Sequence, residues 1–453
     1  MRLHLVAAAA LLAALAGCAT APAQQTAGAK PKNIIFFLGD GMGINTLTAA
    51  RIYAVGEAGQ LTLDTLPESA FVKTYSSDAQ VTDSAASMTA YMTGVKANNG
   101  VISMRGGSAA VTLAELAKQR GMAAGVVTTT RVTDATPAAT YAHVVKREFE
   151  ADIAAALVPG GAGYNAALGA TGLDVVFGGG VNAFVGGAQG GVRTDGRDLL
   201  AELRAKGYRT PSTAAELSSL DERAVQPVIG LFAPSNMSFN AVRDAAKEPS
   251  LAEMTSKAIG ILSKNPNGFF LMVEGGLIDL ALHATNARRA LQETVAFDQA
   301  LKSAITQMEA IDPGLKNTLI VATADHDHTL LLNGYAKRTG PTTATQPGVL
   351  GLVKQVSDGK PRRDLDGAPM TIIGFGTGEH RVKGSRASQV ALTDDIAAAD
   401  NYHQEAVVRT APGDETHGGT DVYLGAIGAG AERFHGTIDN THVFNVIKAA
   451  AGW

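Results

Sequence analysis

The chain has 453 residues, of which 46% are apolar and 18% are charged, and its formal net charge is −4. This composition is typical of a globular protein with a large core, and it excludes a disordered or fibrous chain. A nucleic-acid-binding protein would be expected to carry a basic excess, which this chain lacks, so we expect no nucleic-acid partner. Any anion must be bound by a local site.

The first residues predict an export signal. Arg2 and His4 precede a run of Ala, Leu and Val that is too short to span a bilayer, so we expect residues 1–17 to be a signal peptide. The run ends in LAGC at Cys18, which resembles the lipobox of bacterial lipoproteins. We therefore expect an exported lipoprotein of the periplasm or cell envelope, anchored through Cys18. The alternative is an ordinary secretory signal in which Cys18 is incidental.

The segment after this signal predicts a tether and then a single domain. Residues 18–32 would comprise the lipidated Cys18 and a flexible stretch rich in Ala, Gln, Thr, Gly and Pro. Cys18 is the only cysteine of the chain, so the fold has no internal disulfide. Residues 33–453 would form one catalytic domain.

Apolar runs alternate with helical stretches along this domain. The runs, expected as buried strands, lie at 33–38, 123–127, 268–273, 318–322 and 370–373, and the helices at 112–120, 251–265 and 287–308. This alternation predicts an α/β fold with a central, mostly parallel sheet flanked by helices on both faces. The more polar segment 335–418 is expected to be an irregular insertion near the active-site end of the sheet.

Several of the runs end in groups that bind metal ions. Asp40 follows the first run, Glu274 ends another, and Asp325 with His326 follows a third. In open α/β sheets the site lies at the carboxyl ends of the strands, although a single acidic residue there is usually a cap or turn residue. Asp279 and His283 are four residues apart on a predicted helix, so they share a face and can chelate one ion.

The segment VTDSAASMTAYMTG, residues 81–94, predicts a turn followed by a helix, with Ser84 in its first turn. A helix N-terminus favours anions through its free N–H groups and its dipole. Helix propensity alone makes Ser84 an N-cap residue rather than a nucleophile.

Six motifs in order resemble those of the alkaline phosphatase family. They are DGMG at 40–43, DSAAS at 83–87 with TGVK at 93–96, DATP at 134–137, EGGLID at 274–279 with His283, TADHDH at 323–328, and ETHGG at 415–419. A single motif could mislead, but six in the family's order make coincidence improbable. The resemblance implies an alkaline phosphatase-like fold and a metal-dependent hydrolase of phosphate monoesters that releases inorganic phosphate.

The resemblance also implies a role for each matching residue. Ser84 would form a phosphoserine intermediate, and Arg147 would bind the phosphate oxygens. Two alternatives to the role of Arg147 are open: Lys146 could bind the phosphate instead, or Arg147 could form only a salt bridge on the face of a helix. Two Zn²⁺ and one Mg²⁺ would be the cofactors. The first zinc ion would be held by Asp279, His283 and His417, the second by Asp40, Asp325 and His326, and the magnesium ion by Asp40, Thr136 and Glu274, with Asp134 acting through water.

One position departs from the family. Leu280 stands where relatives often carry Lys, His or Trp, and an apolar side chain can neither ligate a metal nor donate a hydrogen bond. The identity of the third ion is therefore open, and we expect weaker inhibition by phosphate. Relatives are often dimers and some are monomers, so a homodimer is one expectation for this chain.

The residues leave competing functions open. A phosphodiesterase, sulfatase or metal-dependent phosphomutase of the same superfamily would have similar metal ligands. The two alanines after Ser84 disfavour a sulfatase, and Glu274 favours monoesters over diesters. A lipoprotein that binds phosphate without turnover would require the loss of at least one catalytic group, and the expected groups are all present in the sequence.

Overall fold

The computed structural model describes residues 30–224 and 226–453. The predicted signal peptide, Cys18 and the tether up to residue 29 lie outside the described residues. Within the described part of the chain, no helix combines the length and the apolar character needed to cross a membrane.

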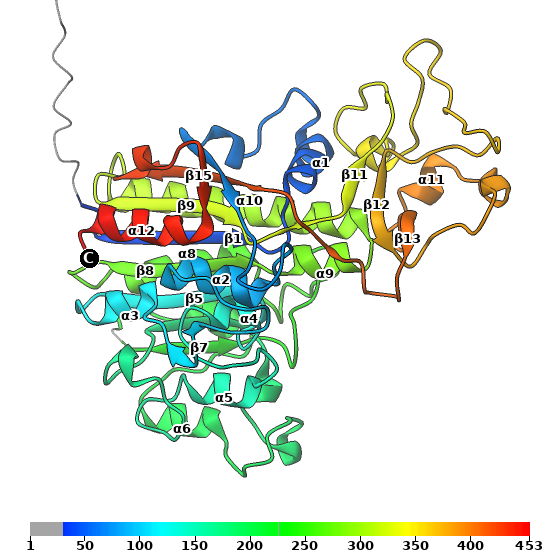
Figure 1. The fold of residues 1–453 in the computed structure, drawn as a ribbon. Helices are drawn as coiled ribbons and strands as arrows, with labels where there is room; N and C mark the ends of the chain where they lie inside the picture. Colours follow the sequence, from blue (N-terminus) through cyan, green and yellow to red (C-terminus); the bar gives the residue numbers. More distant parts are fainter. Residues whose placement is uncertain (1–29, 225) are drawn as a thin grey trace, which may run out of the picture.

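A nine-stranded sheet forms the centre of the molecule (Figure 1). Its pairings are parallel except for those of β15, which runs against both of its neighbours. This confirms the mostly parallel sheet predicted from the sequence. In spatial order the strands are β16 (Thr437–Asp439), β2 (Glu68–Lys73), β15 (Val422–Gly428), β9 (Thr318–Ala324), β1 (Asn33–Gly39), β8 (Phe269–Gly275), β5 (Ala123–Arg131), β6 (Val175–Gly179) and β7 (Val228–Leu231).

Helices cover the sheet in two layers, as predicted (Figure 1). One layer contains α1 (Ile44–Val55), α8 (Leu251–Leu262), α9 (Leu277–His283) and α10 (Ala287–Ile311). The other contains α2 (Ser84–Thr93), α3 (Leu113–Lys118), α4 (Ala135–Ala138) and α12 (Asn440–Ala451). Near the β7 edge lie α5 (Glu150–Ala155) and α6 (Leu199–Ala205) (Figure 1), and α7 (Ala214–Ser219) contacts α8.

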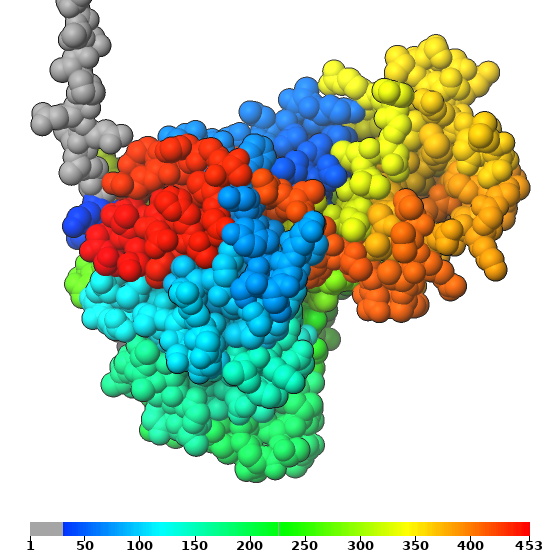
Figure 2. All heavy atoms as spheres, viewed as in Figure 1, coloured from blue at the N-terminus to red at the C-terminus, as the bar shows by residue number. Residues whose placement is uncertain are grey.

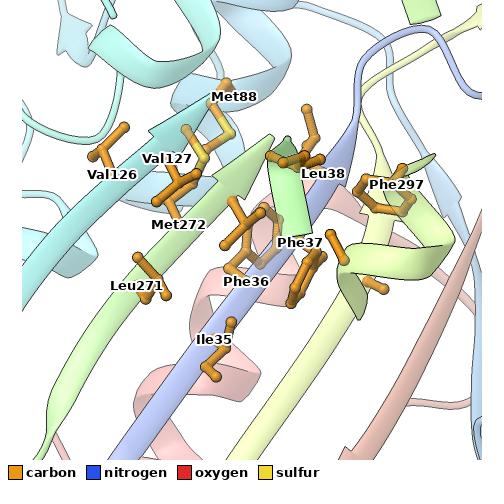
Figure 3. Close-up of a cluster of buried hydrophobic side chains, with 14 of the residues drawn as sticks. Ile35, Phe36, Phe37, Leu38, Met88, Val126, Val127, Leu271, Met272 and Phe297 are labelled. Atoms are coloured by element: carbon orange, nitrogen blue, oxygen red, sulfur yellow. The ribbon is translucent and has the colours of Figure 1, made fainter. Parts of the chain in front are cut away.

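The central strand β1 joins the two helix layers to the core (Figure 3). Successive side chains of a strand point to opposite faces. Phe36 therefore packs on Tyr91 of α2, with ring centroids 5.4 Å apart, and Phe37 packs on Phe297 of α10 at 5.7 Å. All four rings are buried. These contacts fix both helix layers against the strand whose end carries Asp40.

A lobe stands away from the sheet at one side of the molecule (Figure 2). It contains a three-stranded sheet made of β11 (Leu330–Leu332), β12 (Ile373–Gly378) and β13 (Ala406–Arg409), with the short helix α11 (Asp394–Ala397). The predicted strand at 370–373 is therefore wrong in two respects. The strand begins at Ile373, and it pairs in this separate sheet, because an apolar run does not specify its partner strands.

Two pairs of very short strands lie outside these sheets. The strands β3 (Met104–Arg105) and β4 (Ser108–Ala109) form a small hairpin. The strands β10 (Asp327–His328) and β14 (His417–Gly418) pair with each other beyond the end of β9. This second pairing brings two histidine-bearing segments, far apart in sequence, to the same place.

Candidate active site

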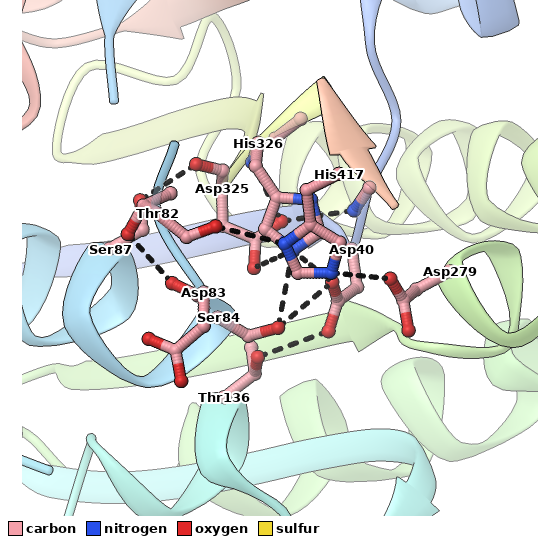
Figure 4. Close-up of polar contacts among 12 residues, drawn as sticks. Asp40, Thr82, Asp83, Ser84, Ser87, Thr136, Asp279, Asp325, His326 and His417 are labelled. Atoms are coloured by element: carbon pink, nitrogen blue, oxygen red, sulfur yellow. Dashed lines mark hydrogen bonds and ion pairs between the residues drawn. The ribbon is translucent and has the colours of Figure 1, made fainter. Parts of the chain in front are cut away.

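The register of the parallel strands gathers the acidic residues at one edge of the sheet. Gly39 at the end of β1 lies opposite Gly275 of β8 and Ala324 of β9. Asp40, Glu274 and Asp325, which adjoin these positions, consequently lie together at the carboxyl ends of three neighbouring strands. Figure 4 shows Asp40 and Asp325 close to Ser84, His326 and His417. This is the position at which open α/β sheets bind their ligands.

Ser84 is the first residue of α2 and is almost fully buried. The N-cap is Asp83, whose side chain accepts a hydrogen bond from the N–H of Ala86 at 3.0 Å. Because Asp83 caps the helix, the Ser84 hydroxyl is not needed for that purpose. Its Oγ lies 3.2 Å from His326 Nε2 and 3.4 Å from Asp40 Oδ1. The structure therefore places Ser84 inside the group of predicted metal ligands, at a helix N-terminus.

Asp40, Asp325 and His326 form the first group that could hold a metal ion. His326 Nε2 lies 3.3 Å from Asp40 Oδ1 and 3.4 Å from Asp325 Oδ2. The backbone N–H of Gly41 donates to Asp325 Oδ1, whereas Asp325 Oδ2 is buried without a hydrogen-bond partner among the described residues. Burial and repulsion from Asp40 raise the pKa of the Asp325 carboxyl to about 8. These oxygens therefore favour a bound cation.

Asp279, His283 and His417 come together as a second group, which also includes His328. The Nε2 atoms of His283 and His417 are 3.3 Å apart and lie 3.3 and 3.6 Å from Asp279 Oδ1. In both rings Nδ1 faces a backbone carbonyl, that of Glu415 for His283 and that of Thr82 for His417. Because a carbonyl only accepts, each Nδ1 carries the proton and each Nε2 offers a lone pair to a metal.

The charges of the second group agree with this protonation. Burial, together with repulsion from His326 and His328, lowers the pKa of His417 well below its ordinary value. A neutral imidazole is the form that ligates a metal. The first group, which contains His326, lies next to the second group, which contains His417, because these two rings stack with their centroids 3.5 Å apart.

Asp40 also faces a third set of oxygens. Thr136 Oγ1 donates to Asp40 Oδ2 at 3.1 Å, and Thr130 Oγ1 donates to Glu274 Oε2 at 3.2 Å. Glu274 Oε1 is fully buried and has no hydrogen-bond partner in the described part of the chain. Burial and repulsion from Asp40 raise the pKa of Glu274 well above its ordinary range. Carboxylate and hydroxyl oxygens of this kind suit a hard cation.

Asp134 and Arg147 lie beside these groups rather than within them. Asp134 pairs with Arg131 at 2.8 Å and with Arg147 at 3.0 Å, and it caps α4. Arg147 also contacts Asp83, the residue before Ser84, at 3.2 Å. Burial opposes the charge of Arg147, but attraction by Asp134, Asp83 and Asp40 outweighs burial and raises the pKa of the guanidinium. Lys146, the alternative considered for this role, is exposed.

Three residues that help to hold this site together, His328, Glu415 and Asp83, had no role predicted from the sequence. His328 contacts Asp279 Oδ1 through Nε2 at 2.7 Å and the Glu415 carboxylate through Nδ1. Attraction to these two carboxylates outweighs burial and raises the pKa of His328 to about 10. Asp83 both caps α2 and forms an ion pair with Arg147. His328 and Glu415 lie two residues from the predicted ligands His326 and His417, and this closeness in sequence was the signal that could have identified them.

The comparisons with known proteins agree with this geometry. A sequence model of the alkaline phosphatase family matches residues 31–453. The tissue-nonspecific alkaline phosphatase of Rattus norvegicus is 36% identical over 459 residues, which cover 93% of this chain and 83% of the rat protein. The alkaline phosphatase of Gadus morhua is also 36% identical, with 93% of this chain and 92% of the cod protein covered.

Solved structures give the same assignment. The alkaline phosphatase of the Antarctic bacterium TAB5 has a TM-score of 0.65 and 25% identity, with 94% of this chain and 99% of that chain covered. The alkaline phosphatase of Thermus thermophilus has a TM-score of 0.68 and 25% identity, with 98% and 96% covered. This chain therefore belongs to the alkaline phosphatase family and is a metal-dependent phosphomonoesterase.

Proposed function

We propose that the enzyme hydrolyses phosphate monoesters in two steps through a phosphoserine at Ser84. The observation that carries this proposal is the position of Ser84 Oγ, 3.2 Å from His326 and 3.4 Å from Asp40 at the N-terminus of α2. In the first step Ser84 Oγ bonds to phosphorus and the alcohol of the substrate leaves. In the second step water displaces Ser84 and inorganic phosphate is released.

We propose the same metal ligands as those implied by the resemblance of the motifs to the alkaline phosphatase family. Asp279, His283 and His417 would hold one Zn²⁺, since two imidazoles and a carboxylate suit that ion. Asp40, Asp325 and His326 would hold a second Zn²⁺, and Asp40, Thr136 and Glu274 would hold Mg²⁺, with Asp134 acting through water. When bound, the ions would supply positive charge for the attacking and leaving oxygens and lower the pKa of the groups bound to them.

The remaining groups of the site bind and orient the substrate. Arg147 offers two parallel N–H donors, which match the geometry of two phosphoryl oxygens. Asp83 and Asp134 contact separate nitrogens of its guanidinium and fix its direction before substrate arrives. The N–H groups at the start of α2 add partial positive charge beside the transferred phosphoryl group. The guanidinium of Arg147 and the N–H groups of α2 would thus be the two kinds of donor for the phosphoryl oxygens.

Replacement of Ser84 tests the nucleophile. We expect wild type, loaded with zinc and magnesium at alkaline pH, to hydrolyse p-nitrophenyl phosphate in strong preference to bis-p-nitrophenyl phosphate. Ser84→Ala should reduce kcat by about 10³-fold or more, which is about 4 kcal/mol in the barrier. Ser108→Ala, at an exposed serine, is the matched control. Preference for the diester would identify a phosphodiesterase, and inactive metal-loaded wild type would identify a binding protein.

Removal of metal tests the assigned cations. Asp40, Glu274, Asp279 and Asp325 are buried in one region, so without cations their repulsion should destabilise the fold. We expect exhaustive chelation to lower Tm by at least about 5 °C, and zinc with magnesium to restore it. Asp325→Asn, which removes one of these charges, should lose less on chelation. An unchanged Tm in protein shown to be metal-free would contradict the assignment.

Leu280 provides a test of phosphate affinity. It lies next to Asp279 on α9 and is half-buried. Leu280→Lys introduces a cation that can donate to phosphate, so we expect the inhibition constant of inorganic phosphate to fall by about 10-fold. Leu280→Met is the control, because it retains an apolar side chain of similar volume. Equal inhibition constants for the three proteins would show that this position does not set phosphate affinity.

We also propose that the protein is exported and held at the cell envelope by lipid on Cys18, with homodimerisation expected from the resemblance. The support is the apolar run that ends at Cys18. In cells fed labelled palmitate, wild type should carry label in the membrane fraction, whereas Cys18→Ala should be unlabelled and leave that fraction. Label in both proteins, or in neither, would refute the anchor. Light scattering on the Cys18→Ala protein measures the oligomeric state.

A further inference from the structure

A further set of side chains that could hold a metal ion lies in the lobe, outside the groups around Ser84. Glu379, His380 and His403 each offer one donor atom, and these atoms lie within 4.8 Å of one another. We call them the lobe triad. Glu379 Oε1 is 2.9 Å from His403 Nδ1 and 3.4 Å from His380 Nε2, and the two rings are 5.3 Å apart. None of the three residues contributes to the groups assigned to phosphate hydrolysis.

The small sheet of the lobe brings the triad together. Glu379 and His380 directly follow β12, and His403 lies shortly before β13, which pairs with β12 in parallel (Figure 1). The backbone N–H of Ala406 also donates to the carbonyl of His380 at 3.2 Å. Residues that are 23 or more positions apart are therefore held at one point by backbone hydrogen bonds. The juxtaposition follows from the fold rather than from side-chain flexibility.

The donor set is that of a zinc site. Two imidazoles and one carboxylate are preferred zinc ligands, and three protein ligands leave a fourth position for water. The His380 side chain is 54% exposed, so that position can be open to solvent. His403 Nδ1 also lies 2.6 Å from the carbonyl oxygen of Ala284, so the position of this ring is set from both the lobe and the end of α9.

The triad also contacts the helix that carries two proposed active-site ligands. Ala284, whose carbonyl faces His403, directly follows His283 at the end of α9. The next residue, Thr285, is buried in a left-handed conformation with φ of 51°, and its carbonyl accepts the N–H of Gln404 at 2.9 Å. A non-glycine residue in this conformation persists only where its surroundings hold it.

We propose that Glu379, His380 and His403 bind a zinc ion within the lobe, beside the C-terminal end of α9. The ion would hold β12 and the segment before β13 together, next to the strained residue Thr285. It is separate from the ions assigned to the site of Ser84, so the proposal does not depend on the phosphoserine mechanism. The alternative is a metal-free ion pair between Glu379 and the two histidines.

Zinc content distinguishes these possibilities. Full-length enzyme, dialysed against zinc and magnesium and then against metal-free buffer, is analysed by inductively coupled plasma mass spectrometry. We expect His380→Ala to hold one zinc ion per chain fewer than wild type, and the control His435→Ala, at an exposed histidine, to match wild type. Equal zinc content in His380→Ala and wild type would overturn the proposal.

A rescue variant and an activity measurement separate loss of a ligand from damage to the fold. Cysteine is a zinc ligand, so His380→Cys should recover the zinc ion that His380→Ala loses. Because the triad lies outside the phosphatase site, His380→Ala should keep p-nitrophenyl phosphate hydrolysis within about threefold of wild type. Failure of His380→Cys to recover zinc, or loss of more than one zinc ion together with activity in His380→Ala, would overturn an independent site.

Discussion

The burial of several carboxylates at one edge of the sheet is the constraint on which the rest of the site depends. Asp40 adjoins both Asp325 and Glu274, and burial with mutual repulsion raises the pKa values of the last two. A parallel sheet produces this arrangement directly, because its register places the ends of β1, β8 and β9 in one row. Either protons or cations must offset the repulsion within such a row, so the strands that form the core also favour the binding of metal ions.

The contacts around the histidines fix the orientation of the proposed metal ligands. Backbone carbonyls hold the Nδ1 protons of His283 and His417, while His328 connects Asp279 to Glu415. The partners are far apart in sequence, and the pairing of β10 with β14 places His328 opposite His417. The ring orientations are therefore fixed before an ion arrives, which reduces the free energy needed to order the ligands on binding.

The positions of Asp40, Glu274 and Asp325 could be anticipated because they lie at the ends of long apolar runs, whereas the roles proposed for the site residues come from the resemblance of the motifs to the alkaline phosphatase family. The run before Asp40 and the helix after Ser84 specify their own local structure, and the i, i+4 spacing of Asp279 and His283 requires only a helix. Roles that depend on long-range contacts could not be derived in this way. Asp83 is one case, because its function combines a local cap with a contact to Arg147, 64 residues away.

The fold of the lobe also depends on long-range contacts that could not be derived from the sequence. The apolar run at 370–373 indicated a strand, but its partners β11 and β13 could be identified only from the structure. Glu379 and His403 are brought together by that pairing, and no local spacing connects them. The lobe also touches α9 one residue beyond His283. A polar segment that the sequence indicates as an insertion thus helps to support a proposed metal ligand, because its residue His403 contacts the carbonyl of Ala284 at the end of the helix that carries this ligand.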